Sequence, residues 1–218
     1  MKLQLALDRL EVAEAIQLTK KVEDFIDWVE VGTSLIKEFG MRSVKEIKQA
    51  FPNKVIVADM KTIDNARYEF EMAFQAGADV VTVMGVSPIV TINACMEVAE
   101  RSNKLVMLDL LNTSKEQLQE LLKYKDAIFC VHVSKDEQEE FRAQNLGSRS
   151  GGLLIDSSLK QAVAGGITID SLESLRKTLN PSVVIVGSAI TKANNPSDVA
   201  AKFKQVVHKG NRVCQSSK

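Results

Sequence analysis

Short apolar runs alternate with amphipathic segments along almost the whole chain. The apolar runs have the length and composition of buried β-strands and are found at 3–8, 28–32, 55–61, 80–84, 105–111, 127–133, 161–165 and 183–187. Between them, apolar residues recur with the spacing of one helix face, at 12–23, 43–51, 67–76, 91–102, 115–123, 171–179 and 197–208. Strict alternation of strand and helix predicts right-handed crossovers and a parallel sheet.

The number of predicted strands favours a (β/α)₈ TIM barrel, because an open doubly wound sheet, the competing interpretation, typically has fewer strands. No linker or low-complexity segment divides the 218 residues, so we expect a single barrel domain over 1–210 and a frayed polar tail over 211–218. At 142–157 the sixth helix is due, but Gly151 and Gly152 would each cost about 1 kcal/mol inside a helix. We expect a short or displaced helix there, with a mobile loop.

Composition narrows the function classes. Lys and Arg together number 28, as do Asp and Glu, so the net charge gives no reason to expect nucleic acid or an anionic membrane as partner. No apolar run is long enough to span a membrane, and the apolar start of the chain is too short for a signal peptide.

Cys95, Cys130 and Cys214 are far apart and form no Cys-x-x-Cys pair, which argues against a zinc site or a disulfide framework. We expect Cys95 and Cys130 to be buried thiols and the protein to occupy a reducing cytoplasm.

The most informative stretch is 55–64, where an apolar strand leads directly into Asp59, Lys61 and Asp64. Side chains repeat every two residues along a strand, so we expect Asp59 and Lys61 to point to the same side. Asp64, three residues further on, could reach back to the same site or across to another subunit. An ammonium held between carboxylates stays protonated and suits the stabilisation of a developing oxyanion.

Polar residues also end other predicted strands: Asp8, Glu30, Asp109 and His132. In a barrel these ends meet at one mouth, which favours a catalytic site over surface decoration. Glu30 and Asp59 come from adjacent strands and could share one divalent cation, and two carboxylates completed by water and substrate oxygens are typical of Mg²⁺.

Glycine-rich turns follow the last two predicted strands. Gly165 and Gly166 follow the seventh strand, and Gly187 with Ser188 follows the eighth. Glycine lets backbone N–H groups approach an anion closely, and these loops are the usual phosphate position in such barrels. We therefore expect a phosphorylated ligand.

Taken together, these segments resemble the orotidine 5′-monophosphate decarboxylase suprafamily over nearly the whole chain. The resemblance rests on Asp59-x-Lys61-x-x-Asp64 and on the segments Leu-Ala-Leu-Asp (5–8), Val-Glu-Val-Gly-Thr (29–33), Ala-Gly-Ala-Asp-Val-Val-Thr-Val (76–83), Val-His (131–132), Ala-Gly-Gly-Ile (164–167) and Val-Ile-Val-Gly (184–187). Within the suprafamily the chain is most similar to the 3-hexulose-6-phosphate synthases and next to the 3-keto-L-gulonate-6-phosphate decarboxylases. Glu30 points to the magnesium-dependent branch, because the metal-free pyrimidine enzyme has lysine at that position.

The resemblance implies an aldehyde-lyase in which Mg²⁺ is held by Glu30 and Asp59 and an enediolate of ribulose 5-phosphate attacks formaldehyde. It implies that Lys61 stabilises the negative oxygens and that Asp64 comes from the partner subunit of a homodimer. His132 is the first candidate for proton transfer. The expected substrate contacts are Asp8, Asp109 and Lys135, with Gly165, Gly166, Gly187 and Ser188 holding the phosphate.

Some residues depart from the synthase pattern and leave alternatives open. The segment that follows His132 is closer to the keto-gulonate decarboxylases, which have arginine where Lys135 stands, and the eighth-strand turn reads Gly-Ser-Ala rather than Gly-Gly-Gly. Ala164-Gly-Gly and Asp109 match the synthases instead. A carboxy-lyase and a catalytically silent sugar-phosphate-binding barrel are the alternatives, and a sugar-phosphate epimerase is disfavoured because it would need several histidines for a transition metal.

Overall fold

The computed structural model describes residues 1–134 and 158–208. Its strands are β1 (Lys2–Leu7), β2 (Trp28–Val31), β3 (Val55–Thr62), β4 (Val80–Met84), β5 (Leu105–Asp109), β6 (Ile128–His132), β7 (Lys160–Ala164) and β8 (Val183–Val186). Each strand pairs in parallel with the next, and β8 pairs with β1, so the sheet closes into a barrel. The expected TIM barrel is confirmed, and the open doubly wound sheet is excluded.

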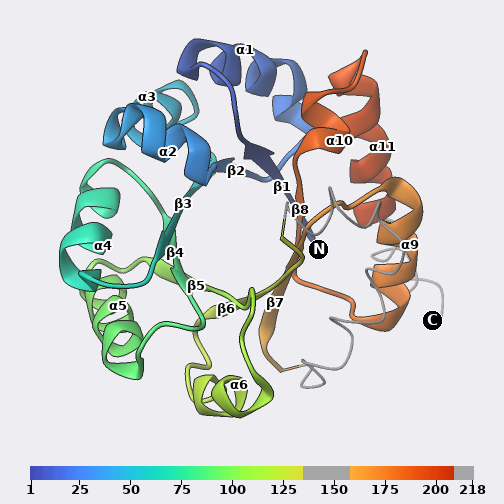
Figure 1. Ribbon diagram of the computed structural model, residues 1–218. Helices are drawn as coiled ribbons and strands as arrows, with labels where there is room; N and C mark the ends of the chain where they lie inside the picture. Colours follow the sequence, from blue (N-terminus) through green and yellow to red (C-terminus); the bar gives the residue numbers. More distant parts are fainter. Residues whose placement is uncertain (135–157, 209–218) are drawn as a thin grey trace, which may run out of the picture.

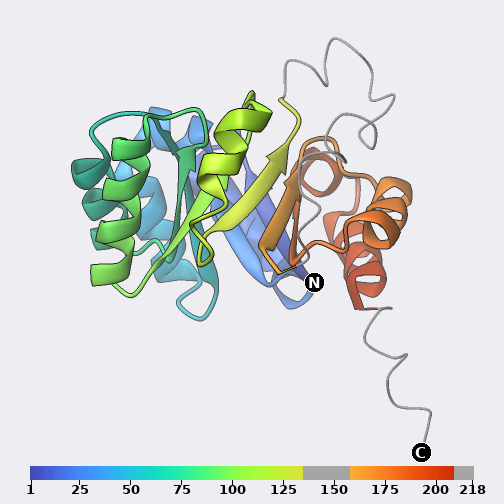
Figure 2. The ribbon, with the colours of Figure 1, turned by 90° about the horizontal axis from the view of Figure 1, so that it is seen from below.

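Helices form the outer ring seen along the barrel in Figure 1. They are α1 (Val12–Val22), η1 (Glu23–Phe25), α2 (Thr33–Phe39), α3 (Met41–Ala50), α4 (Ala66–Gln75), α5 (Ile89–Arg101), α6 (Lys115–Leu121), α9 (Ile169–Thr178), α10 (Ser188–Thr191) and α11 (Pro196–His208). In the side view of Figure 2, α4 and α5 flank the barrel opposite α9 and α11. Among the described residues, none of these helices has the length and apolarity needed to cross a bilayer.

Within the described residues, two α-helices lie outside the helical ranges predicted from the sequence. The connection between β2 and β3 holds both α2 and α3, which meet at Gly40, a residue with φ of 60° that ends the first helix and precedes the second. Glycine adopts this left-handed region without the steric cost that a side chain brings. The second unpredicted helix, α10, is a single turn after β8. The predictions for 142–157 and 211–218 lie outside the described residues.

Apolar side chains fill two separate regions. Residues that face outward from the strands, such as Ile56 and Ala58, pack against the helices in the larger cluster. Inward residues, such as Val57, Val80 and Met107, fill the barrel itself. This alternation follows the two-residue repeat of a strand, and it leaves the carboxyl ends of the strands as the place where inward side chains become polar.

At the opposite, amino-terminal end of the strands, partly buried carboxylates join elements that are distant in sequence. Asp27 accepts hydrogen bonds from the backbone N–H of Leu3 (2.9 Å) and from Lys204 Nζ (3.0 Å), which ties α11 to β1. Asp79 accepts from Lys48 Nζ (2.8 Å), Lys104 Nζ (2.6 Å) and the backbone N–H of Ile56 (3.0 Å). This end of the barrel therefore carries stabilising ion pairs.

The Asp79 cluster generates a stability prediction. Burial alone would raise the pKa of Asp79, but Lys104, Lys48 and the Ile56 N–H outweigh it and hold this pKa below its ordinary value. A depressed folded-state pKa stabilises the protein above the ordinary aspartate pKa, and that contribution is lost as pH falls through the folded value. We expect Asp79→Asn to lower the free energy of unfolding by about 1.5–3 kcal/mol at pH 7. The deficit should shrink toward acid pH in urea titrations.

The control is Asp126→Asn, because Asp126 is exposed. It should change the free energy of unfolding by less than about 0.5 kcal/mol. An Asp79 deficit that stays constant down to acid pH would contradict the ionic origin of the stabilisation.

Candidate active site

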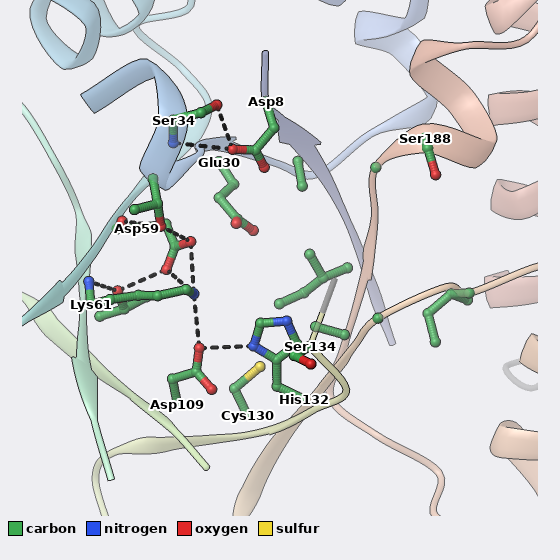
Figure 3. Close-up of a pocket in the computed structure, with 18 of the residues that line it drawn as sticks. Asp8, Glu30, Ser34, Asp59, Lys61, Asp109, Cys130, His132, Ser134 and Ser188 are labelled. Atoms are coloured by element: carbon green, nitrogen blue, oxygen red, sulfur yellow. Dashed lines mark hydrogen bonds and ion pairs between the residues drawn. The ribbon is translucent and has the colours of Figure 1, made fainter. Parts of the chain in front are cut away.

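One cavity of about 720 Å³ opens at the carboxyl ends of the strands. It is lined by nearly all the residues that the sequence singled out, namely Asp8, Glu30, Asp59, Lys61, Asp109, His132, Gly165, Gly166, Gly187 and Ser188. Figure 3 shows the labelled side chains around this space, on the strands and on the segments that follow them. Asp64 does not line the cavity and is exposed, and Lys135 lies outside the described residues.

The Lys61 ammonium is the centre of the charged cluster. Its Nζ lies 3.0 and 2.9 Å from the two carboxylate oxygens of Asp59 and 2.9 Å from Asp109 Oδ2. Burial alone would lower the pKa of Lys61, but the two carboxylates outweigh it and hold this pKa above its ordinary value. Lys61 is therefore a fixed positive charge at neutral pH.

Asp59 and Lys61 do meet, but regular strand alternation is not the reason. The register of β3 against β4 jumps between Ala58 and Thr62, which is a bulge, and Lys61 has φ of 48°. The backbone N–H of Lys61 donates to Thr82 Oγ1 at 2.8 Å. The bulge directs the long Lys61 side chain back over the Asp59 carboxylate.

Asp109 links Lys61 to His132. Its Oδ2 accepts from Lys61 and lies 2.9 Å from His132 Nδ1, and its Oδ1 accepts from the backbone N–H of Leu111 at 3.0 Å. Burial alone would raise the pKa of Asp109, but His132 and Lys61 outweigh it, so this pKa is far below its ordinary value. Because both oxygens of Asp109 accept bonds from within the chain, the geometry suits orienting Lys61 and His132, a role the sequence did not suggest.

Glu30 is buried beside this cluster and has an amide partner. The Gln4 side-chain amide donates to its carboxylate. Burial first and the nearby charge of Asp59 second raise the pKa of Glu30 to about 8. The Glu30 carboxyl faces the cavity. The nearby positive charge of Lys61 is too weak to offset the effects of burial and Asp59 on its pKa.

The donor set of Glu30 and Asp59 fits a hard divalent cation such as Mg²⁺. Both are carboxylates that line one cavity, and the repulsion between them is what a cation would relieve. Within 1–134 and 158–208 no group of three or more His, Cys, Asp or Glu side chains is arranged to bind a metal. The remaining ligands of such a cation would therefore be water and substrate oxygens.

Asp8 is held at the mouth of the cavity by α2. Its Oδ1 accepts from the backbone N–H (3.2 Å) and the hydroxyl (2.7 Å) of Ser34. A Cβ at Gly32 would lie 2.4 Å from both the Asp8 carboxyl carbon and the Leu7 carbonyl oxygen. Glycine at this position is therefore what allows Asp8 and α2 to approach.

Across the cavity, the loops after β7 and β8 present backbone rather than side chains. Gly165 and Gly166 have φ of 100° and 61°, and a Cβ at Gly165 would lie 2.5 Å from the Val133 carbonyl oxygen. Gly187 and Ser188 follow β8 at the start of α10. The two glycine turns follow neighbouring strands and can receive an anion.

Comparison with known proteins decides the family. A family model for "Orotidine 5′-phosphate decarboxylase / HUMPS family" matches residues 1–203. The 3-hexulose-6-phosphate synthase of Bacillus subtilis (strain 168) is 38% identical over 217 residues, which cover 96% of this chain and 100% of that protein. The crystal structure of 3-hexulose-6-phosphate synthase from Salmonella typhimurium is 35% identical with a TM-score of 0.85, covering 95% of this chain and 98% of that one.

The chain belongs to the orotidine 5′-phosphate decarboxylase / HUMPS family. The resemblance drawn from the sequence is therefore confirmed. The chain is also similar to a solved structure with a different name. KGPDC from Streptococcus mutans is 27% identical with a TM-score of 0.86, covering 94% of this chain and 96% of that one.

Several residues that hold the carboxylates of the cavity were missed from the sequence. Thr33 and Thr82 donate to the Asp59 carboxylate, Ser34 holds Asp8, and Gln4 holds Glu30. Thr82 and Gln4 could have been identified from the sequence, because each is a polar residue at an inward position of an otherwise apolar strand. The predicted buried thiols Cys95 and Cys130 are confirmed, and Cys130 lies at the cavity wall.

Gly32→Ala tests the close approach at Asp8. The new methyl group must displace the Asp8 carboxyl or the Leu7 carbonyl, so we expect a loss of about 1–3 kcal/mol in the free energy of unfolding. Gly187→Ala is the control, because a Cβ there would meet nothing nearer than 3.6 Å. Urea unfolding of both variants checks the difference, and equal costs would contradict the packing argument.

Proposed function

We propose that this protein is a Mg²⁺-dependent 3-hexulose-6-phosphate synthase that condenses formaldehyde with D-ribulose 5-phosphate. The observation that carries the proposal is the Lys61 ammonium fixed between Asp59 and Asp109, with His132 attached to the same carboxylate. Similarity over almost the full length to enzymes of that name supports the choice of substrates.

In this proposal Glu30 and Asp59 hold the cation. When bound, Mg²⁺ supplies Lewis-acid stabilisation of negative charge on the sugar oxygens. Lys61 donates a hydrogen bond to the same developing oxyanion. The glycine turns at 165–166 and 187–188 hold the phosphate, and Asp8 accepts from a sugar hydroxyl.

His132 is the proposed proton carrier. The ionised Asp109 accepts from Nδ1, which leaves the other ring nitrogen, Nε2, unprotonated in the neutral imidazole. Nε2 takes the proton from C1 as the C–H electron pair forms the enediolate. The enediolate carbon then bonds to the formaldehyde carbon as the C=O π electrons move to the aldehyde oxygen, and this oxygen takes the proton back from His132 Nε2, which restores the neutral imidazole.

A carboxy-lyase acting on 3-keto-L-gulonate 6-phosphate is the second candidate. The structural similarity to KGPDC favours it, and loss of carbon dioxide would generate an enediolate at the same place. A silent sugar-phosphate-binding protein would bind without turnover of either compound. The same assay separates all three functions.

The proposed assembly is a homodimer whose active sites lie at the interface. Asp64 is exposed and accepts from the neighbouring backbone N–H of Asn65 (2.7 Å). The large apolar side chains Ile63, Tyr68 and Val90 are 55%, 63% and 73% exposed. A partner subunit would cover these side chains and receive Asp64 in its own cavity.

The proposed place of action is the cytoplasm, where thiols stay reduced. Buried free Cys95 and Cys130 support this proposal. The partners in this proposal are the sugar phosphate, formaldehyde and a second copy of the chain, with neither nucleic acid nor membrane.

Paired substrate assays test the function. With Mg²⁺, the wild-type protein should consume formaldehyde only when ribulose 5-phosphate is present, and chelation should abolish this consumption. Lys61→Ala should lower kcat by at least about a hundredfold, because a charge aimed at the oxyanion is lost. Lys20→Ala, on an exposed face of α1, is the control. Release of carbon dioxide from the keto acid instead would support the second candidate.

Mixing variants tests the interface. Lys61→Ala and Asp64→Asn should each be inactive alone, but a mixed dimer joins an intact Lys61 of one chain to an intact Asp64 of the other. Random exchange of subunits should restore about a quarter of wild-type activity, because half of the dimers are mixed and each has one intact site. If Asp64 serves its own chain, mixing restores nothing.

A further inference from the structure

Thr82 is a buried hydroxyl that the proposed chemistry does not use directly. It lies on β4 two residues after the inward-facing Val80, is 3% exposed, and lines the cavity. Its hydroxyl accepts the backbone N–H of Lys61 (2.8 Å) and donates to Asp59 Oδ1 (2.9 Å). One oxygen atom therefore joins the backbone of one active-site residue to the carboxylate of another.

The first of these bonds acts on the conformation of Lys61. A non-glycine residue with φ of 48° has a sparsely populated backbone conformation, which costs about 1–3 kcal/mol and persists only when neighbouring groups hold it. The bulge removes Lys61 from regular pairing with β4, and the Thr82 hydroxyl takes the N–H that the bulge releases. Thr82 therefore stabilises the bend that directs the Lys61 side chain over Asp59.

The second bond acts on the Asp59 carboxylate. Thr82 holds Oδ1, while the single proton of the Thr33 hydroxyl is shared between Oδ2 (2.7 Å) and the backbone carbonyl oxygen of Asp59 (2.9 Å). Thr82 therefore restrains the Asp59 carboxylate independently of its ion pair with Lys61. A hydroxyl has a single proton, and because an N–H cannot accept it, the Thr82 proton is directed to Asp59.

We propose that Thr82 is a positioning residue that preorganises Asp59 and Lys61 for the reaction through this double hydrogen bond. The inference deepens the proposed function and rests on it for its kinetic consequence. Serine could make both bonds, whereas valine has nearly the same shape and can make neither. Comparing these two residues separates hydrogen bonding from packing.

The experiment compares Thr82→Val, Thr82→Ser and a control, Thr19→Val. Thr19 is a buried threonine on α1 whose hydroxyl donates to the Ala15 carbonyl (2.8 Å), on the outside of the barrel. Steady-state kinetics with ribulose 5-phosphate and formaldehyde should show kcat lowered about 10- to 100-fold in Thr82→Val, as expected for misplaced catalytic groups. KM for the sugar phosphate should change by less than about threefold, Thr82→Ser should recover most of kcat, and Thr19→Val should leave kcat unchanged.

A double-variant comparison tests whether Thr82 acts through Lys61. Adding Thr82→Val to Lys61→Ala should lower kcat by a smaller factor than Thr82→Val does in the wild-type protein, because Lys61 is already gone and only the bond to Asp59 remains to be lost. Losses that multiply, or wild-type kcat in folded Thr82→Val, would overturn the proposal. If Thr82→Val does not fold, Thr82→Ala is held to the same expectations.

Amide hydrogen exchange gives a readout that needs no activity. The Lys61 amide should exchange at least about tenfold faster in Thr82→Val than in Thr82→Ser, because its acceptor is missing. Equal exchange would overturn the proposal. A wild-type protein that turns over neither substrate would refute the proposed function, while exchange at Lys61 would still decide whether Thr82 holds this backbone.

Discussion

The site depends on one partly buried ammonium, that of Lys61, which lies among three buried carboxylates. Asp59 and Asp109 both contact Lys61, and Glu30 lies close enough to Asp59 for the charges to affect each other. Negative groups at such short range repel strongly where little water screens them. Lys61 makes the Asp59–Asp109 pair stable, and Glu30 is left as the carboxyl that still needs a positive charge. This unbalanced negative charge is what a cation held by Glu30 and Asp59, as proposed, would neutralise.

The two ends of the barrel use charge for different purposes. At the amino-terminal end, Asp79 is shared by two lysines and a backbone N–H, so its charge is fully compensated. At the carboxyl end, compensation is incomplete and the groups face a cavity rather than a packed interface. A parallel barrel separates these tasks because every strand contributes one end to each rim.

The barrel could be predicted because its buried strands are continuous apolar runs, and this pattern depends little on tertiary context. The sequence also predicted most cavity residues because the carboxyl ends of parallel strands converge. It did not predict the bulge at Lys61, since bulges depend on pairing with a neighbouring strand. The helix α2 was missed because one helix was expected between β2 and β3, whereas Gly40 divides this connection into two helices. Thr82 and Gln4 were missed because their roles depend on which carboxylates lie across the barrel. Asp64 is exposed and does not line the cavity of its own chain, so its predicted role remains a prediction.

The position of Cys130 matters because formaldehyde, the proposed substrate, is an electrophile that can react with thiols. Its thiol lies at the wall of the cavity, and burial, with the charges of Asp109 and Glu30, raises the pKa of this thiol well above its ordinary value. A thiol that stays protonated is a poor nucleophile, so an aldehyde passing through the cavity meets an inert sulfur. Burial in the cavity wall first, and the negative charges of the reacting groups second, would thereby limit alkylation of this thiol by the proposed substrate.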